Sequence, residues 1–174
     1  MSNFSLHPAT LDDARTLAQI GAATFLESFV EEIEGDAIIN HCEAQHSKEV
    51  YEKYLSSPRG KAWIARYAKT GVPIGYALNC TPELDEFELQ EGDIELKRIY
   101  AFSRFHGGGL GKALMEASIE HAKDNCAPRL LLGTYEGNER AVAFYKKNGF
   151  DIIGTRRFFV GGVYYDDVIM GLDL

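Results

Sequence analysis

A strand-like segment that runs through a cluster of glycines into a helix-like segment is the feature that most constrains this sequence. Residues 94–102 alternate as in a strand, residues 107–109 and 111 are glycines, and residues 110–125 have apolar residues at helical spacing. Glycine lacks a Cβ, so backbone N–H groups can approach a ligand closely. The first N–H groups of a helix have no internal partner, and the helix dipole favours an anion there. The pattern therefore predicts a phosphate site.

Two common phosphate-binding motifs do not fit this turn. The P-loop, aligned on Gly111-Lys112, requires glycine at position 106 and serine or threonine at 113, where the chain has His106 and Ala113. The dinucleotide fingerprint G-x-G-x-x-G fails in both registers, because Lys112 or Leu114 stands where its last glycine belongs. The alternatives at this point are another phosphate ligand and a glycine-rich connection that binds nothing.

Length and composition predict one globular domain. The chain has 174 residues, of which 45% are hydrophobic and 25% charged, and it carries a net charge of −8. A nucleic-acid-binding protein is usually basic, so we expect none as a partner, whereas a small cation would suit the charge. No apolar run approaches a membrane span, and no signal peptide is visible. The three cysteines form no motif, and free thiols fit a cytoplasmic protein.

The pattern along the chain predicts one α/β domain around a mixed central sheet. The first strand is expected to stop at Pro8, and the last two strands form a hairpin around Gly161-Gly162. The expected strands are residues 4–6, 62–67, 74–80, 94–102, 129–133, 150–160 and 163–172. The expected helices are residues 11–29, 47–55, 110–125 and 138–148.

Two motifs resemble the GCN5-related N-acetyltransferase (GNAT) superfamily. Its central motif, Q/R-x-x-G-x-G/A, is similar to His106-Gly107-Gly108-Gly109-Leu110-Gly111, with histidine in place of the first residue. Its N-x-x-A-x-x-F/L-Y-x-K-x-G-F segment is similar to residues 138–150, which read NERAVAFYKKNGF. Within the superfamily, residues 23–29, 94–100 and 133–139 look most like PaiA-type polyamine acetyltransferases.

The resemblance implies a GNAT-like single domain, a mixed sheet with helices on both faces. Residues 1–60 would form variable helices on the acceptor side, and residues 62–172 the acyl-CoA-binding core. The implied activity is direct transfer of an acetyl group from acetyl-CoA to a primary amine of a small molecule, with a polyamine as one candidate. The alternatives are a protein lysine or N-terminal acetyltransferase and a catalytically silent acyl-CoA-binding module. A homodimer is left open.

The resemblance also implies which residues hold acetyl-CoA. The pantetheine arm pairs with the backbone of the strand before the glycines, and the N–H of Ile99 or Ala101 serves the oxyanion. The glycine turn takes the pyrophosphate, and one of two lysines reaches the 3′-phosphate unless both are ordinary surface residues. The implied cofactor residues are Ile99, Tyr100, Ala101, His106, Gly107, Gly108, Gly109, Leu110, Gly111, Lys112, Asn138, Tyr145 and Lys147.

Three residues are candidates for moving protons. The resemblance assigns Tyr145 as the acid that protonates the leaving thiolate, although its spacing alone also fits a core aromatic. Glu95 is the candidate base, and the alternative is an exposed strand carboxylate. Glu136 is a further candidate base, and Asn138 is also a plausible helix N-cap.

Acidic residues are candidates for the acceptor side. Glu27 and Glu31 belong to the first predicted helix and the segment that follows it, and residues 83–93 form an acidic loop. Either of these two acidic clusters could attract a polycation. The alternative is that they are solvated surfaces, as charged runs usually are. His41, Cys42 and His46 match no zinc spacing, so no metal is expected.

Overall fold

The computed structural model describes residues 3–84, 87–160 and 163–174. The predicted Gly161-Gly162 turn, and Asp85 and Glu86 of the acidic loop, lie outside these ranges. The strands are β1 (Phe4–Pro8), β2 (Lys61–Tyr67), β3 (Pro73–Cys80), β4 (Ile94–Ala101), β5 (Arg129–Tyr135), β6 (Asp151–Val160) and β7 (Val163–Asp173). The helices are α1 (Ala14–Phe29), α2 (Gly35–Gln45), α3 (Lys48–Ser56), α4 (Leu110–Asp124) and α5 (Glu139–Lys147), with short 3-10 turns η1 (Leu11–Asp13) and η2 (Ser103–Phe105).

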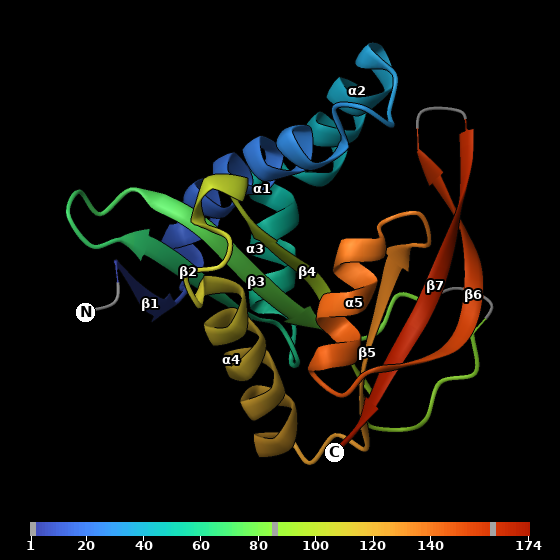
Figure 1. The fold of residues 1–174 in the computed structure, drawn as a ribbon. Helices are drawn as coiled ribbons and strands as arrows, with labels where there is room; N and C mark the ends of the chain where they lie inside the picture. Colours follow the sequence, from blue (N-terminus) through green and yellow to red (C-terminus); the bar gives the residue numbers. More distant parts are fainter. Residues whose placement is uncertain (1–2, 85–86, 161–162) are drawn as a thin grey trace.

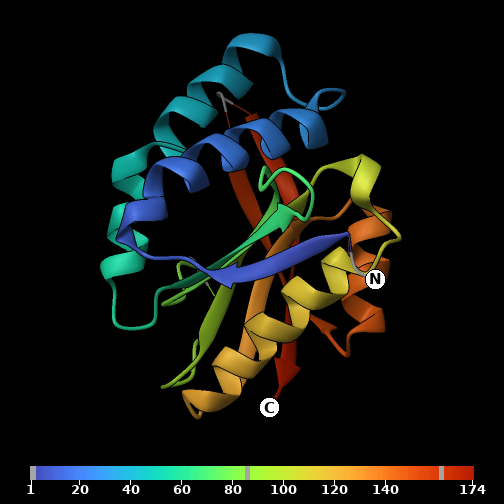
Figure 2. The ribbon, with the colours of Figure 1, turned by 90° about the vertical axis from the view of Figure 1, so that its left-hand side faces the viewer.

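One mixed sheet forms the centre of the molecule, in the order β1-β2-β3-β4-β5-β7-β6. Neighbouring strands are antiparallel except β4 and β5, which are parallel. Helices α1 and α3 cover one face, and α4 and α5 the other (Figures 1 and 2). The central strands are buried on both faces: Ile64 and Tyr76 pack under α1 and α3, while Trp63 and Ala77 belong to the core beneath α4. The predicted fold class is confirmed.

Two sequence predictions need correction. Helix α2 was not predicted, because Gly35, Asn40 and His41 are weak helix formers and its apolar residues pack mainly on Phe25 of α1. The first strand does not stop before Pro8 but includes it, opposite Trp63 of β2. Because β1 is an edge strand, the missing N–H of proline costs no ladder hydrogen bond on its open side.

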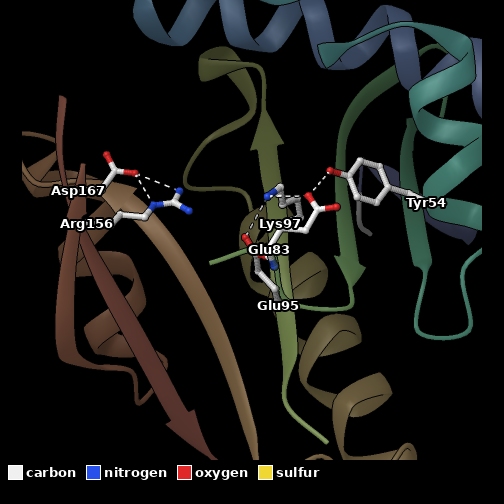
Figure 3. A network of polar contacts seen from close by, with 6 residues as sticks. All are labelled: Tyr54, Glu83, Glu95, Lys97, Arg156 and Asp167. Carbon is white, nitrogen blue, oxygen red and sulfur yellow. Dashed lines mark hydrogen bonds and ion pairs between the residues drawn. The ribbon is translucent and has the colours of Figure 1, made fainter. Parts of the chain in front are cut away.

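The two central strands separate soon after they begin. The parallel pairing of β4 with β5 consists of Ile94 with Leu130 and Glu95 with Leu131. Beyond that point the strands diverge, as Figures 1 and 3 show. A bulge accompanies the divergence: Leu78 of β3 lies opposite Arg98 while Asn79 lies opposite Leu96, so Lys97 is an extra residue on β4.

The bulge shifts the alternation of side chains in the second half of β4 by one residue, so each side chain there lies on the face opposite to the one expected. Before it, Glu95 faces the α1 and α3 side while Leu96 faces the α4 core; after it, Arg98 and Tyr100 face the α1 and α3 side. No helix of the described ranges is long and apolar enough to cross a membrane.

Candidate active site

The opening between β4 and β5 presents unpaired backbone. The N–H of Phe102 donates to the carbonyl of Ile74 in β3. Since N–H groups of successive strand residues point to opposite edges, those of Ala101 and Ile99 point toward the opening. Helices α4 and α5 begin beyond the carboxyl ends of these same two strands. In open α/β sheets this is where ligands bind.

The glycine turn has the geometry of an anion cradle. Gly107 and Gly109 have φ angles of +80° and +84°, a region that favours glycine, and no atom lies within 4 Å of where a Cβ would stand on either. Gly109 is the N-cap of α4 and offers no side chain to the N–H groups of the first turn. A Cβ on Gly111 would contact the ring of Phe144 at 3.6 Å, so the turn lies against α5. The structure thus leaves room for a phosphate beside free N–H groups.

Four polar residues predicted around the cofactor have different surroundings. His106 is exposed, and its Nε2 lies 2.8 Å from the carbonyl oxygen of Ala101, so the side chain folds back on the end of β4. Asn138 is the N-cap of α5 as expected, because its side-chain oxygen accepts the N–H of Ala141 at 3.0 Å. Lys112 is exposed and forms an ion pair with Glu116 at 3.5 Å, and Lys147 is exposed in the last turn of α5. Their contacts with a cofactor stay predictions.

Tyr145 lies in the core beneath α5 and is 9% exposed. Its ring packs against Phe144 and Phe150, with centroids 5.6 and 6.1 Å away. Burial raises the pKa of Tyr145 far above its usual value, and the charge of Tyr100 adds to this. Burial also raises the pKa of Tyr100 to about 12. Tyr145 therefore holds its proton at neutral pH, as an acid must, and it is also the core aromatic that its spacing suggested.

Glu95 is buried at the point where β4 and β5 part, so the alternative of an exposed strand carboxylate is wrong. Its side chain is 2% exposed. One oxygen accepts the backbone N–H of Glu83 at 2.7 Å, and the other lies 3.4 Å from Nζ of Lys97. The same Nζ lies 3.0 Å from Glu83, which accepts the hydroxyl of Tyr54 at 2.8 Å. Figure 3 shows these four side chains as one network on the α3 side of β4.

A second ion pair faces this network from the other side of the opening. Arg156 of β6 donates through Nε and Nη2 to Asp167 of β7, at 3.2 and 3.1 Å (Figure 3). A Cβ on Gly133 of β5 would lie 2.6 Å from Nη2 of Arg156, so the guanidinium covers that glycine. Arg156 and Asp167 line a depression of about 350 Å³ together with Glu136, Thr155, Arg157 and Asp166.

Sequence reasoning did not single out Lys97, Arg156 or Asp167. Lys97 lies two residues from Glu95 on one strand, a spacing that places side chains on one face and was a usable signal. Arg156 and Asp167 lie five residues before and five after the predicted Gly161-Gly162 turn, so hairpin register places them opposite each other.

The predicted acceptor carboxylates come from α1 and the segment that follows it. Glu27 of α1 accepts the N–H and the hydroxyl of Ser103 at 2.9 and 3.0 Å, and so ties α1 to the segment after β4. Glu31 is exposed just beyond α1. The contact of Glu27 and Glu31 with an acceptor stays a prediction. Glu136, the further candidate base, is exposed just beyond β5, and its role also stays a prediction.

His41 and His46 pack with aromatic residues. The ring of His41 stacks on Phe25, and Nδ1 of His46 lies 2.9 Å from the hydroxyl of Tyr51. Within the ranges that the structure describes, no three histidine, cysteine or acidic residues are grouped to hold a metal ion. Burial lowers the pKa of His46 to about 3, and the positive charges of Arg98 and His41 contribute.

This shift predicts a loss of stability in mild acid. His46 stays neutral in the folded chain, whereas the unfolded chain binds a proton below its ordinary pKa of 6.5. The contribution of His46 to the free energy of unfolding is therefore fully present above that value, and it is lost as the pH drops toward 3. Between pH 7 and pH 5 the free energy of unfolding should fall by about 2 kcal/mol from this residue. Urea unfolding of the wild type and of His46→Gln, whose amide can still form a hydrogen bond with the hydroxyl of Tyr51, measures the difference; equal losses in both would refute it.

Comparisons with known proteins agree with this geometry. The model of the acetyltransferase (GNAT) family matches residues 26–150, well over half of the chain. An uncharacterised N-acetyltransferase of Mycobacterium bovis is 32% identical over 94% of this chain and 99% of its own length. A spermine/spermidine N(1)-acetyltransferase of Bacillus subtilis is 33% identical over 49% of this chain and 57% of its own length.

Solved structures share the fold. PaiA N-acetyltransferase of Thermoplasma acidophilum, solved in complex with coenzyme A, superposes with a TM-score of 0.78 at 18% identity and covers 98% of this chain and 99% of its own. A GNAT acetyltransferase of Elizabethkingia anophelis with bound acetyl-CoA has a TM-score of 0.60 at 21% identity over all of both chains. Sequence relatives, fold and the glycine cradle at the strand opening agree, and the chain belongs to the GNAT family of acetyltransferases.

Proposed function

We propose that this chain transfers the acetyl group of acetyl-CoA to a primary amine of a small cationic acceptor of the polyamine class. The observation that carries the proposal is the place of Glu95. A buried carboxylate lies at the apex of the opening between β4 and β5, between the unpaired edge of β4 and the polar face under α3. A proton acceptor and a strand edge for the acyl donor are thus neighbours.

The residues present fit coenzyme A. The edge of β4 at Ile99 and Ala101 offers N–H groups to a pantetheine arm and to the oxyanion of the reacting carbonyl. Gly107 to Gly111 and the start of α4 offer N–H groups to the pyrophosphate. Lys112 or Lys147 offers a positive charge to the 3′-phosphate. Residues 62–172 would then hold the donor, and the helices within residues 1–60 would cover the acceptor.

Acetyl-CoA supplies the acetyl group as an activated thioester. The acceptor arrives mainly as an ammonium ion. For a lysine-type group at pH 7, forming the neutral amine costs about 4–5 kcal/mol of free energy. Glu95 takes this proton, directly or through water, so that the nitrogen can bond to the carbonyl carbon. As the carbon–sulfur bond breaks, Tyr145 gives its proton to the sulfur, and the second proton that the nitrogen loses on becoming an amide restores the phenol, directly or through water.

Three observations support a polyamine. Glu136 and Asp166 leave exposed carboxylates in the depression beside Arg156, the chain carries a net charge of −8, and two relatives over about half of the chain are named as spermine or spermidine acetyltransferases. Long cations bind where several carboxylates line one path.

Release of free thiol from acetyl-CoA tests the proposal. Spermidine, spermine, free lysine and a lysine-containing peptide should be compared at equal concentration, with product mass as confirmation. We expect turnover with the polyamines. Turnover with the peptide alone would point to a protein acceptor, and coenzyme A binding without turnover on any amine would contradict the enzyme itself.

Replacing the proposed base gives a direct prediction. Glu95→Gln should lower kcat by about a hundredfold at neutral pH, because the amide keeps the hydrogen bond to the N–H of Glu83 but cannot accept a proton. Binding of coenzyme A, measured by calorimetry, should stay unchanged. Glu52→Gln on α3, a surface carboxylate paired with Lys48, is the matched control and should retain full turnover.

A further inference from the structure

The bulge of β4 brings an ammonium group to the proposed base. Lys97 is the inserted residue, and its side chain is 19% exposed. Its Nζ lies 3.0 Å from a carboxylate oxygen of Glu83 and 3.4 Å from one of Glu95. One cation is therefore shared by two carboxylates, one of which is buried. Two carboxylates that both lie beside one ammonium group are close to each other, and their mutual repulsion is offset only by the positive charge between them.

We propose that Lys97 is a positioning residue that keeps Glu95 ionised and oriented to accept the proton of the acceptor amine. The inference rests on the proposed function, since it concerns the proton acceptor of that reaction. Without the ammonium, the two carboxylates would hold a proton up to a higher pH, and a protonated Glu95 cannot accept another. The longer contact is the one to Glu95, so Glu83 anchors the lysine and the ammonium holds the catalytic carboxylate less tightly.

The other groups around Glu95 do not supply this charge. From α3, Tyr54 donates to Glu83, and burial raises its pKa; from β3, Cys80 lies near Glu95, and burial likewise raises the pKa of its thiol. Both are neutral. Arg98 lies over the rings of Tyr51 and Tyr54, with its Cζ 5.1 and 5.6 Å from their centroids. In the part of the chain that the structure describes, Lys97 is thus the cation in contact with Glu95.

The environment of Glu83 shows the same effect. Burial would raise the pKa of Glu83, but the hydrogen bond from Tyr54 and the charge of Lys97 outweigh it and lower that pKa. The hydroxyl and the ammonium together hold this carboxylate ionised. Glu95 is more deeply buried, and its polar contacts are the ammonium and one backbone N–H.

The test is the pH dependence of kcat/KM between about pH 5 and about pH 9. In Lys97→Met the acidic limb should move up by about one to two pH units, with activity recovering at high pH. Lys97→Arg keeps the charge and should restore the limb to the wild-type position. Lys48→Met removes a lysine from a 3.0 Å surface ion pair and should change nothing. A uniform loss of activity in Lys97→Met, with the limb unmoved, would overturn the proposal.

A second variant should move the acidic limb in the opposite direction. Glu83→Gln keeps an acceptor for Tyr54 but removes the competing carboxylate, so the acidic limb should move to lower pH; an unmoved or raised limb would also contradict the proposal. Coenzyme A affinity and circular dichroism show whether each variant is folded. The two proposals fail separately: full turnover in Glu95→Gln contradicts the base itself, whereas a dead Glu95→Gln with unmoved profiles in the Lys97 and Glu83 variants removes only the role of Lys97.

Discussion

Tyr145→Phe should lower kcat by about a hundredfold while the affinity for coenzyme A stays nearly unchanged. The ring fills the same core volume beside Phe150, so the fold and the cofactor cradle keep their packing. What is lost is a hydroxyl that is protonated at neutral pH, since the ordinary pKa of tyrosine is about 10 and burial raises that of Tyr145 further. The departing sulfur must then take its proton from water.

Steady-state kinetics with the best acceptor, together with calorimetric titration of coenzyme A, provide the measurement. Tyr67→Phe is the matched control, because Tyr67 is a half-buried tyrosine, packed on Phe105, that has no part in the proposed chemistry. Unchanged turnover in Tyr145→Phe would leave Tyr145 as a core aromatic alone. Equal losses in kcat and in coenzyme A affinity would point to damaged packing instead of a missing acid.

Gly109→Val should weaken coenzyme A binding by about tenfold or more, which corresponds to about 1.4 kcal/mol. Gly109 has a φ of +84°, and a β-branched residue avoids this region. Its side chain would also project into the space that is free around the Cβ position, where we place the pyrophosphate. Both effects act on the N-terminus of α4.

Gly71→Val separates the two effects. Gly71 has a φ of +73° with equally open space, but it lies in the turn between β2 and β3. Both variants should lose similar stability in thermal unfolding, and only Gly109→Val should lose affinity for coenzyme A. Normal affinity in Gly109→Val would place the phosphates elsewhere.

The glycine turn and the helices beside it were predictable because their signals are local. Strand, glycines and helix follow each other within a few residues, and the Asn138 cap acts on a group three residues away. The strands of the sheet were predictable because apolar residues alternate along them. Helix α2 escaped prediction because its contacts with Phe25 decide its conformation more than its own residues do.

The polar network escaped prediction for a different reason. Alternation along β4 places Glu95 and Lys97 on one face, but it does not show that this face meets Glu83 and Tyr54, or that the bulge brings Tyr100 to the same face as Glu95. A bulge is set by the partner strand and by what lies beyond it, so neither the sequence of β4 nor its apolar pattern reveals it. The contact of Glu83 with Glu95 likewise needs a loop to fold back over the strand.

The unpaired edge in the middle of the sheet also bears on how the protein persists in a cell. A ligand that completes the sheet binds the folded chain and not the unfolded one, so its concentration sets part of the folding equilibrium. At a hundred times its dissociation constant such a ligand adds about 2.7 kcal/mol, a large share of the stability of an ordinary domain. Resistance to degradation would then rise and fall with the supply of acyl donor, so that the amount of enzyme follows the amount of its substrate.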